Sequence, residues 1–343
     1  MFGTVLCFWF VVWSECGSFV TAWGKEGHEV VGNLAWKLLS EQSQSAVRNI
    51  LQDVPIPDNC TACSPLGQVA DWADTVRRTH EYFWSGPLHY VDVMDEQIQG
   101  GCPVRNETQK ISQDECRFEY ERDCANDICV AGAVVNYTRH LQKFRRDETR
   151  EYGDELLVRD SLMFLTHFVG DLHQPLHVSR SSDRGGNSIH VVYSPGNADT
   201  APKDGRLGYL RAGRHHHVDN LHAVWDTGII ETCVKLNYKE SRVLWEKVLY
   251  ERIIQAQGTG EWDVWTSCPN GAQQTCVSEW SEQSLEYALI WAYRNVDGTA
   301  IGDGTHLSHA YYETRLPFVE HQLTVAAARL ATTLEISFTQ NVA

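Results

Sequence analysis

The sequence predicts one mostly helical domain with a small β-hairpin and disulfide-stapled loops. Apolar residues recur at spacings of three and four along most long segments, which is typical of amphipathic helices. Only one short stretch alternates as a strand does, and cysteines gather in the polar loops. The 343 residues are 43% hydrophobic and 22% charged, which indicates a globular chain. Because no long linker divides it, we expect a single domain.

The first segment is predicted to be a signal peptide. Residues 1–13 are apolar but too short to span a bilayer, and small residues follow them up to Ala22. We therefore expect cleavage of residues 1–22, a mature domain over residues 23–343, and secretion. No later segment approaches 18 uninterrupted apolar residues, so we expect no membrane anchor, and we expect a monomer.

Five apolar stripes predict helices along the mature chain. They are Val30/Val31/Leu34/Ala35/Leu38, Val69/Trp72/Ala73/Val76, Ser161/Phe164/Leu165/Phe168/Leu172, Leu244/Trp245/Val248/Leu249, and a long closing segment over 307–336. Pro317 would either start the closing helix or kink it. The stretch NSIHVVYSP, residues 187–195, reads as a strand and as half of a hairpin.

Cysteines and glycosylation motifs fit an oxidising compartment. The mature chain keeps nine cysteines, which suggests up to four disulfides and one remaining thiol. Cys60–Cys63 and Cys268–Cys276 are plausible local pairs, although spacing alone does not settle connectivity. Acceptor sequences for N-glycosylation begin at Asn59, Asn106 and Asn136.

The stretch HFVGDLHQPLH, residues 167–177, places three histidines and an aspartate behind an apolar run. His167 and Asp171 are four residues apart and share one face of a helix. His222 and Asp226 repeat this spacing in DNLHAVWD. Asp74, His89 and His28 come earlier in the chain, and His177 lies just past Pro175. The members are His28, Asp74, His89, His167, Asp171, His177, His222 and Asp226.

Zinc would satisfy these groups together. A single His/Asp pair at this spacing is more often an ordinary hydrogen-bonded pair. Two pairs at this spacing, together with Asp74 and His89 as a third pair earlier in the chain, favour a zinc site. Zinc binds imidazole nitrogen and carboxylate oxygen, and in catalytic sites it keeps positions open for water. His173 faces away from His167 on a helical count, so we do not expect it to be a ligand.

The ordered motifs resemble a known family. WGKEGH, ADWAD, PLHYVD, LTHFVGDLHQPLH, GGN and DNLHAVWD occur in the order seen in zinc-dependent single-strand-specific nucleases, the mould and plant type I nucleases that also act as 3′-nucleotidases. The resemblance runs from Trp23 to about Phe338. It implies the all-α fold that this family shares with bacterial zinc phospholipase C.

The resemblance also implies three zinc ions. One would be held by Asp74, His89, His167 and Asp171, a second by His28, Asp171 and Trp23, and a third by His177, His222 and Asp226. Trp23 would bind through its backbone carbonyl and its free α-amine, which ligates only when unprotonated. Signal cleavage would therefore be an activating step.

Further residues match the family's substrate positions. Arg77 and Asn187 would lie beside the phosphate, Tyr90 would stack on the base, and Asp92 would bind the base edge. The resemblance implies hydrolysis of single-stranded RNA and DNA and of 3′-nucleotides, with 5′-phosphate products. Cys124–Cys129 matches the family's short bridge, whereas the family's distant partner for Cys116 has no match here; Cys102 is the expected substitute.

The net charge of −16 is unusual for a protein that binds nucleic acid. Three Zn²⁺ ions would supply positive charge where the phosphate binds, so we expect weak affinity with a shallow salt dependence. Two alternatives stay open. In a phospholipase C-like hydrolase the last ligand is typically Glu, whereas this chain has Asp226. An inactive secreted zinc or nucleotide binder is disfavoured because every expected ligand position is filled.

Overall fold

The computed structural model describes residues 23–55, 63–95, 117–146, 152–196, 217–268 and 272–339. Helices make up most of this chain, as the sequence predicts. The longer ones are α1 (Lys25–Leu38), α2 (Glu41–Ile50), α6 (Val130–Arg146), α7 (Tyr152–Leu172), α9 (Ile229–Asn237), α10 (Arg242–Thr259), α12 (Gln274–Tyr287) and α13 (His309–Thr339). Short helices are α3 (Pro65–Val69), α4 (Trp72–Val76), η1 (Phe83–His89), α5 (Tyr120–Asp123), η3 (Ala125–Asp127), η4 (Pro175–His177), α8 (Leu221–Ala223), η6 (Val224–Gly228), α11 (Glu261–Thr266) and η7 (Ala288–Ala292).

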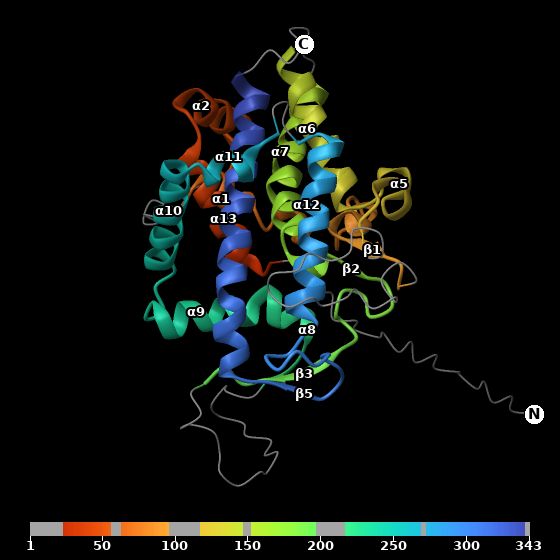
Figure 1. The fold of residues 1–343 in the computed structure, drawn as a ribbon. Helices are drawn as coiled ribbons and strands as arrows, with labels where there is room; N and C mark the ends of the chain where they lie inside the picture. Colours follow the sequence, from red (N-terminus) through yellow and green to blue (C-terminus); the bar gives the residue numbers. More distant parts are fainter. Residues whose placement is uncertain are drawn as a thin grey trace, which may run out of the picture.

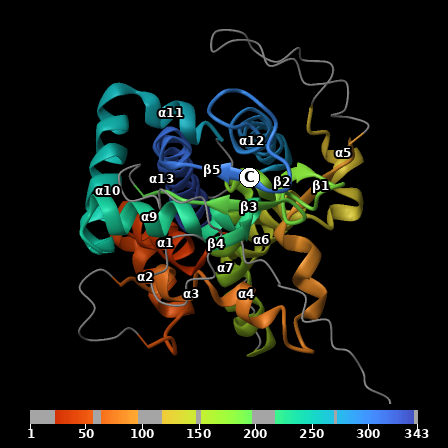
Figure 2. The same cartoon turned by 90° about the horizontal axis from the view of Figure 1, so that it is seen from below.

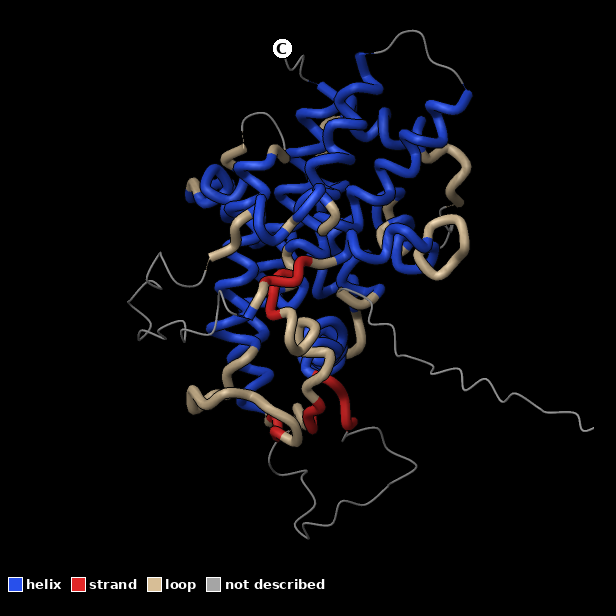
Figure 3. Tube along the Cα trace, turned by 90° about the vertical axis from the view of Figure 1, so that its right-hand side faces the viewer, coloured by secondary structure: helices blue, strands red, loops and turns tan. Residues whose placement is uncertain are grey.

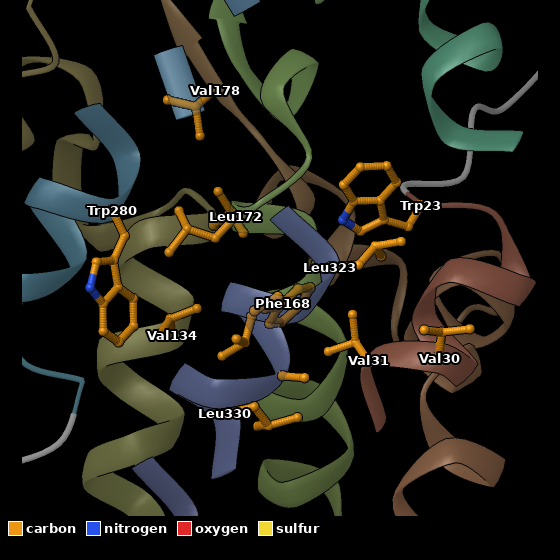
Figure 4. Close-up of a cluster of buried hydrophobic side chains, with 14 of the residues drawn as sticks. Trp23, Val30, Val31, Val134, Phe168, Leu172, Val178, Trp280, Leu323 and Leu330 are labelled. Carbon is orange, nitrogen blue, oxygen red and sulfur yellow. The ribbon is translucent and has the colours of Figure 1, made fainter. Parts of the chain in front are cut away.

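The long α13 organises the bundle (Figure 1). It packs against α1, α6 and α7, and seen from below it lies between α10 and α12 (Figure 2). Side chains from these helices meet in one apolar core, in which Phe168 and Leu172 of α7 lie near Leu323 of α13 (Figure 4). Burying each such side chain stabilises the fold by about 1.5–3 kcal/mol. The core therefore fixes α7, which carries two predicted metal ligands.

Among the described residues, five short strands accompany the helices and are coloured red in Figure 3. β1 (Val91–Val93) pairs in parallel with β2 (Val178–Arg180). β3 (His190–Tyr193) lies between β4 (His217–Asn220), which is antiparallel to it, and β5 (Thr305–Leu307), which is parallel. The predicted strand is thus the centre of a three-stranded sheet and not half of one simple hairpin, and the β1–β2 pair was not predicted.

Two helix predictions are corrected in detail. The stripe from Val69 to Val76 belongs to α3 and α4, which are separated at Ala70 and Asp71. The carbonyl of Ala70 accepts a bond from the His167 ring instead of continuing a helix. Pro317 lies inside α13, which begins at His309, so the proline does not start that helix.

The predicted Cys124–Cys129 and Cys268–Cys276 disulfides are both present. Cys63 is also disulfide-bonded, and Cys233 is a buried free thiol. The predicted partner Cys60, the Cys102–Cys116 pair and the signal peptide lie outside the described residues. Asn136 is exposed on α6, while Asn59 and Asn106 lie outside the described part. No helix among the described residues is long and apolar enough to cross a membrane.

Candidate metal centre

All eight histidine and aspartate side chains predicted as ligands lie in the interior. They form three groups, and within each group the ligand atoms lie within 4.8 Å of one another. The groups are His28/Asp74/His167, His89/His167/Asp171 and His177/His222/Asp226. His167 belongs to the first two groups, which therefore form one continuous cluster. The third group matches the predicted set for the third ion.

Several elements converge on this centre. The last turns of α7 place His167 and Asp171 on one face, and α1 contributes His28. β1 begins two residues after His89 and its parallel partner β2 begins directly after His177, and His177 Nδ1 donates to the His89 carbonyl at 2.6 Å. His222 lies on α8 and Asp226 on the π-helical η6 that continues it. Strand pairing thus brings together two histidines that are 88 residues apart.

Hydrogen bonds to carbonyls set the tautomers of the third group. His177 Nδ1 donates to His89 O and His222 Nδ1 donates to Gly185 O, both at 2.6 Å. Because a carbonyl oxygen only accepts, each neutral ring keeps a bare lone pair on Nε2. The two Nε2 atoms lie only 3.0 Å apart. Neither can donate to the other, so a cation between them would resolve the repulsion.

Asp226 completes this group. Its Oδ2 lies 3.3 Å from His222 Nε2, and its Oδ1 lies 3.9 Å from His177 Nε2. Gln174 Nε2 donates to Asp226 Oδ1 at 2.5 Å, while Gln174 Oε1 accepts from Leu176 N at 2.6 Å. The glutamine therefore orients the carboxylate and ties it to the turn that ends in His177.

Asp171 occupies a bridging position in the other cluster. Its Oδ1 lies 3.2 Å from His28 Nε2, while its Oδ2 lies 3.0 Å from His89 Nδ1 and 3.2 Å from His167 Nε2. His167 Nδ1 donates to Ala70 O at 2.6 Å, which directs its Nε2 toward the carboxylate of Asp171. Asp74 Oδ1 lies 3.6 Å from His89 Nδ1.

Buried polar atoms without hydrogen bonds gather here. Both ring nitrogens of His28, Oδ1 of Asp171 and Oδ2 of Asp226 make none in the described structure. Leaving such groups unpaired in the interior costs several kcal/mol. Imidazole nitrogens and carboxylate oxygens are the donors that zinc accepts, so the residues fit this ion.

Burial keeps most of the histidines neutral. It lowers the pKa of His177 to about 3 and the pKa values of His89 and His222 to about 4, so each ring is in its ligating form at neutral pH. Burial also disfavours a charge on His167, but the carboxylates of Asp171 and Asp74 outweigh it and raise its pKa to about 9. Burial raises the pKa of Asp226 well above its ordinary value. A bound cation would favour the ionised carboxylate.

The predicted substrate residues lie around this centre. Arg77 Nη2 contacts Asp74 Oδ1 at 3.0 Å. Tyr90 directly follows His89 and is exposed, as is Asp92 on β1. Burial raises the pKa of Tyr90, and the nearby Asp92 carboxylate raises it further. Asn187 donates to Arg184 O at 2.7 Å in the loop that presents Gly185 to His222.

Trp23 is fully buried beside the centre. Its side chain lies close to Gly27 and Gly170, and the next residue, Gly24, donates its N–H to Asp226 O at 2.8 Å. His173 instead lies away from the ligand groups, where its Nε2 accepts from Arg329 at 2.8 Å and its Nδ1 donates to Val169 O. Those contacts are consistent with the expectation that His173 is no ligand.

Sequence reasoning missed the residues that support the ligands. A Cβ atom at Gly170 would lie 2.7 Å from His28 Nδ1, so the ring needs a glycine there. A glycine inside a predicted helix was a readable signal for such close packing. The roles of Gln174 and of the Ala70 and Gly185 carbonyls had no comparable signal, since they depend on contacts between distant segments.

Comparisons with known proteins agree with this geometry. The model of the S1/P1 Nuclease family matches residues 23–339. The chain is 33% identical to Endonuclease 4 of Arabidopsis thaliana over 92% of its own length and 89% of that protein. It is 29% identical to Nuclease S1 of Aspergillus oryzae, covering 93% and 92%, and 27% identical to Nuclease P1 of Penicillium citrinum, covering 90% and 95%.

Proposed function

The chain belongs to the S1/P1 nuclease family, and from this premise we propose that it is a secreted three-zinc enzyme that cleaves single-stranded RNA and DNA. It hydrolyses the 3′-oxygen–phosphorus bond, leaves 5′-phosphates, and also acts on 3′-nucleotides. As a member of this family it is a nuclease, a hydrolase of phosphoester bonds. The observation that carries the metal assignment is the pair of facing Nε2 lone pairs of His177 and His222, 3.0 Å apart.

In the proposed enzyme, the ligand residues hold three zinc ions. The first ion takes Asp74, His89, His167 and Asp171, the second takes His28, Asp171 and Trp23, and the third takes His177, His222 and Asp226. The position of Asp171, with one oxygen toward His28 and the other toward His89 and His167, supports a bridging role. Bound zinc supplies an activated water for attack on phosphorus and charge stabilisation at the departing oxygen.

Side chains around the metal centre bind the phosphate and the base. Arg77, held by Asp74, stabilises charge on the non-bridging phosphate oxygens. Asn187 contacts the phosphate from the opposite loop. Tyr90 offers its exposed ring to the base, and Asp92 accepts from the base edge. A duplex hides its base faces, so stacking selects single strands.

The Asp74→Asn variant tests the metal mechanism. It removes one ligand charge while keeping the shape of the side chain, and we expect loss of zinc and at least a 100-fold lower rate of 5′-phosphate release from poly(A). Zinc per chain, measured on dialysed protein by atomic absorption, should fall from about three. A parental rate at unchanged zinc content would falsify the metal assignment.

The role of Trp23 has its own test. Mature protein beginning at Trp23 should hold about three zinc ions, whereas a chain extended by two residues at its N-terminus should hold about two, because a peptide nitrogen does not ligate as an amine does. Equal zinc content in the two proteins would refute ligation by the α-amine. A choline-phospholipid assay run beside the nuclease assay distinguishes a phospholipase C-like activity.

A further inference from the structure

The exposed aromatic side chains of the described structure gather in one place. They are Phe83, Trp84 and Tyr90, with 72%, 55% and 41% of their surface exposed, and all belong to η1 or the residue after it. Met94, which is 51% exposed, lies just past β1. Scattered exposed apolar residues are ordinary, whereas several on one short element indicate a binding surface. We call Phe83 and Trp84 the outer aromatic pair.

The segment that carries this pair is anchored firmly. The amide and hydroxyl of Ser85 both donate to the Tyr82 carbonyl, at 2.9 and 2.8 Å. The Tyr82 hydroxyl in turn donates to Asp160 on α7 at 2.6 Å. The exposed rings are therefore attached to the rigid core of the bundle, so little conformational entropy is lost when a ligand stacks on them.

The outer aromatic pair and the metal centre share one element, because η1 begins with Phe83 and Trp84 and ends with His89. Beneath η1, the buried rings of Phe168 and Phe164 pack between His89 and Trp84, with centroid distances of 4.9, 5.2 and 5.8 Å along that series. Six residues of 3₁₀ geometry separate Trp84 from Tyr90, or ~12 Å at ~2.0 Å per residue. A few stacked bases, spaced ~3.4 Å apart, cover that length.

We propose that the outer aromatic pair is a second stacking site for a single-stranded substrate. This site binds bases beyond the nucleotide held at Tyr90. The proposal rests on the function proposed above. A chain with a net charge of −16 attracts a phosphate backbone poorly, while stacking needs no positive charge and accepts any base. Only unpaired bases expose their faces, so the site adds affinity for long single strands and none for a mononucleotide.

The test compares two substrates on the Phe83→Ala/Trp84→Ala double variant. For a single-stranded 10-mer we expect KM to rise roughly tenfold or more with kcat unchanged, since stacked bases are lost. For a 3′-mononucleotide, which reaches only the Tyr90 site, we expect no change in either constant. The single variant Trp84→Phe keeps Phe83 and an aromatic ring at position 84. It should therefore retain most of the parental protein's affinity for the oligonucleotide.

Controls separate this idea from folding defects and from the parent proposal. Val264→Ala, a truncation of a 74% exposed side chain on α11, should change neither substrate's constants. Equal effects on both substrates, or none on the 10-mer, overturn the stacking site. If the parental protein hydrolyses neither substrate, the proposed function fails. In that case, fluorescence anisotropy of a labelled 10-mer still tests the stacking site. If the outer aromatic pair binds bases, the double variant should bind the 10-mer more weakly than the parental protein does.

Discussion

At the scale of single residues, backbone carbonyls decide which nitrogen of a histidine can bind a metal. His167, His177 and His222 each donate Nδ1–H to a carbonyl, from Ala70, His89 and Gly185 respectively. Each ring is thereby oriented with Nε2 toward its cluster. Such partners usually tune metal affinity 10–100-fold, so the carbonyls belong to the site as much as the rings do.

Gly170→Ala should displace His28. The new Cβ would lie 2.7 Å from His28 Nδ1, closer than real Cβ contacts, so the ring must move. We expect about one zinc ion fewer per chain and a lower melting temperature. Gly258→Ala is the matched control, because its Cβ meets nothing within 4 Å in α10 and alanine should stabilise that helix by about 1 kcal/mol. Unchanged zinc content in Gly170→Ala would contradict the need for glycine.

Gln174→Glu should weaken the third zinc site. It replaces the amide that donates to Asp226 with a second carboxylate, which repels the ligand and misplaces it. We expect zinc affinity at this site to fall roughly 10–100-fold, measured by competition with a chelator. Gln44→Glu, which loses donors to Trp36 O and Leu39 O far from the site, should keep its zinc. The role of Gln174 is refuted if both variants bind zinc equally.

At the scale of elements, the loop between β2 and β3 is held in place by hydrogen bonds and positions His222. Asp183 Oδ1 accepts from Gly186 N at 2.7 Å and from Tyr293 OH at 2.8 Å, and Arg180 pairs with Oδ2. Ser181 and Ser182 are held in the same way by Asp95. Gly185, with φ +62°, sits in a conformation that favours glycine and offers its carbonyl to His222.

Asp183→Ala should loosen this loop and with it the third site. Without the carboxylate, Gly186 N and Tyr293 OH lose their acceptor, and Gly185 O is no longer fixed against His222. We expect roughly tenfold weaker zinc affinity at one site, by chelator competition, together with a lower melting temperature. Asp297→Ala, which removes an acceptor for Thr299 in an exposed turn, is the control. Equal zinc affinity in the two variants would show that the loop does not position His222.

At the scale of the whole molecule, the metal-free protein should be most stable near pH 6.5. The lowered pKa values of His89, His177 and His222 mean that the unfolded chain takes up protons below about 6.5 that the folded chain refuses. Stability is therefore lost as pH falls from 6.5 towards 4. On the acid side the raised pKa of Asp226 acts in the opposite sense, but the three lowered histidines outnumber it. The raised pKa of His167 changes nothing there, because its contribution is already complete below about pH 6.5.

On the alkaline side the stability falls as pH rises, because the contribution of protonated His167 is lost as pH rises through about 9. Melting curves of chelator-treated protein at pH 4.5, 6.5 and 9 check this, and the middle value should be highest. Adding zinc at pH 7 should raise the melting temperature, since the assembled ligand groups bind the ion more tightly than the unfolded chain does. A melting temperature that climbs steadily towards pH 4.5 would contradict the assignment of neutral buried histidines.

The sequence by itself determined the helical class and the ligand-bearing motifs, whereas it left the disulfide connectivity open. His167/Asp171 and His222/Asp226 could be read directly, because i, i+4 spacing is a local property of helices. Ordered motifs also carried the family resemblance. Periodicity predicted the closing helix over 307–336, which the structure has at His309–Thr339, but missed the break at Ala70, since the partner of that carbonyl is a ring 97 residues away.

Only the tertiary structure decided how the motifs meet. The β1–β2 register joins His89 to His177, Gln174 reaches Asp226, and Gly185 presents its carbonyl to His222. It also decided that Phe83 and Trp84 stay exposed, whereas other rings of the described chain, such as Phe164 and Phe168, are buried. The physical reason is that spacing along a helix is set by local backbone geometry. Pairing between distant segments is set by packing, which one sequence does not display.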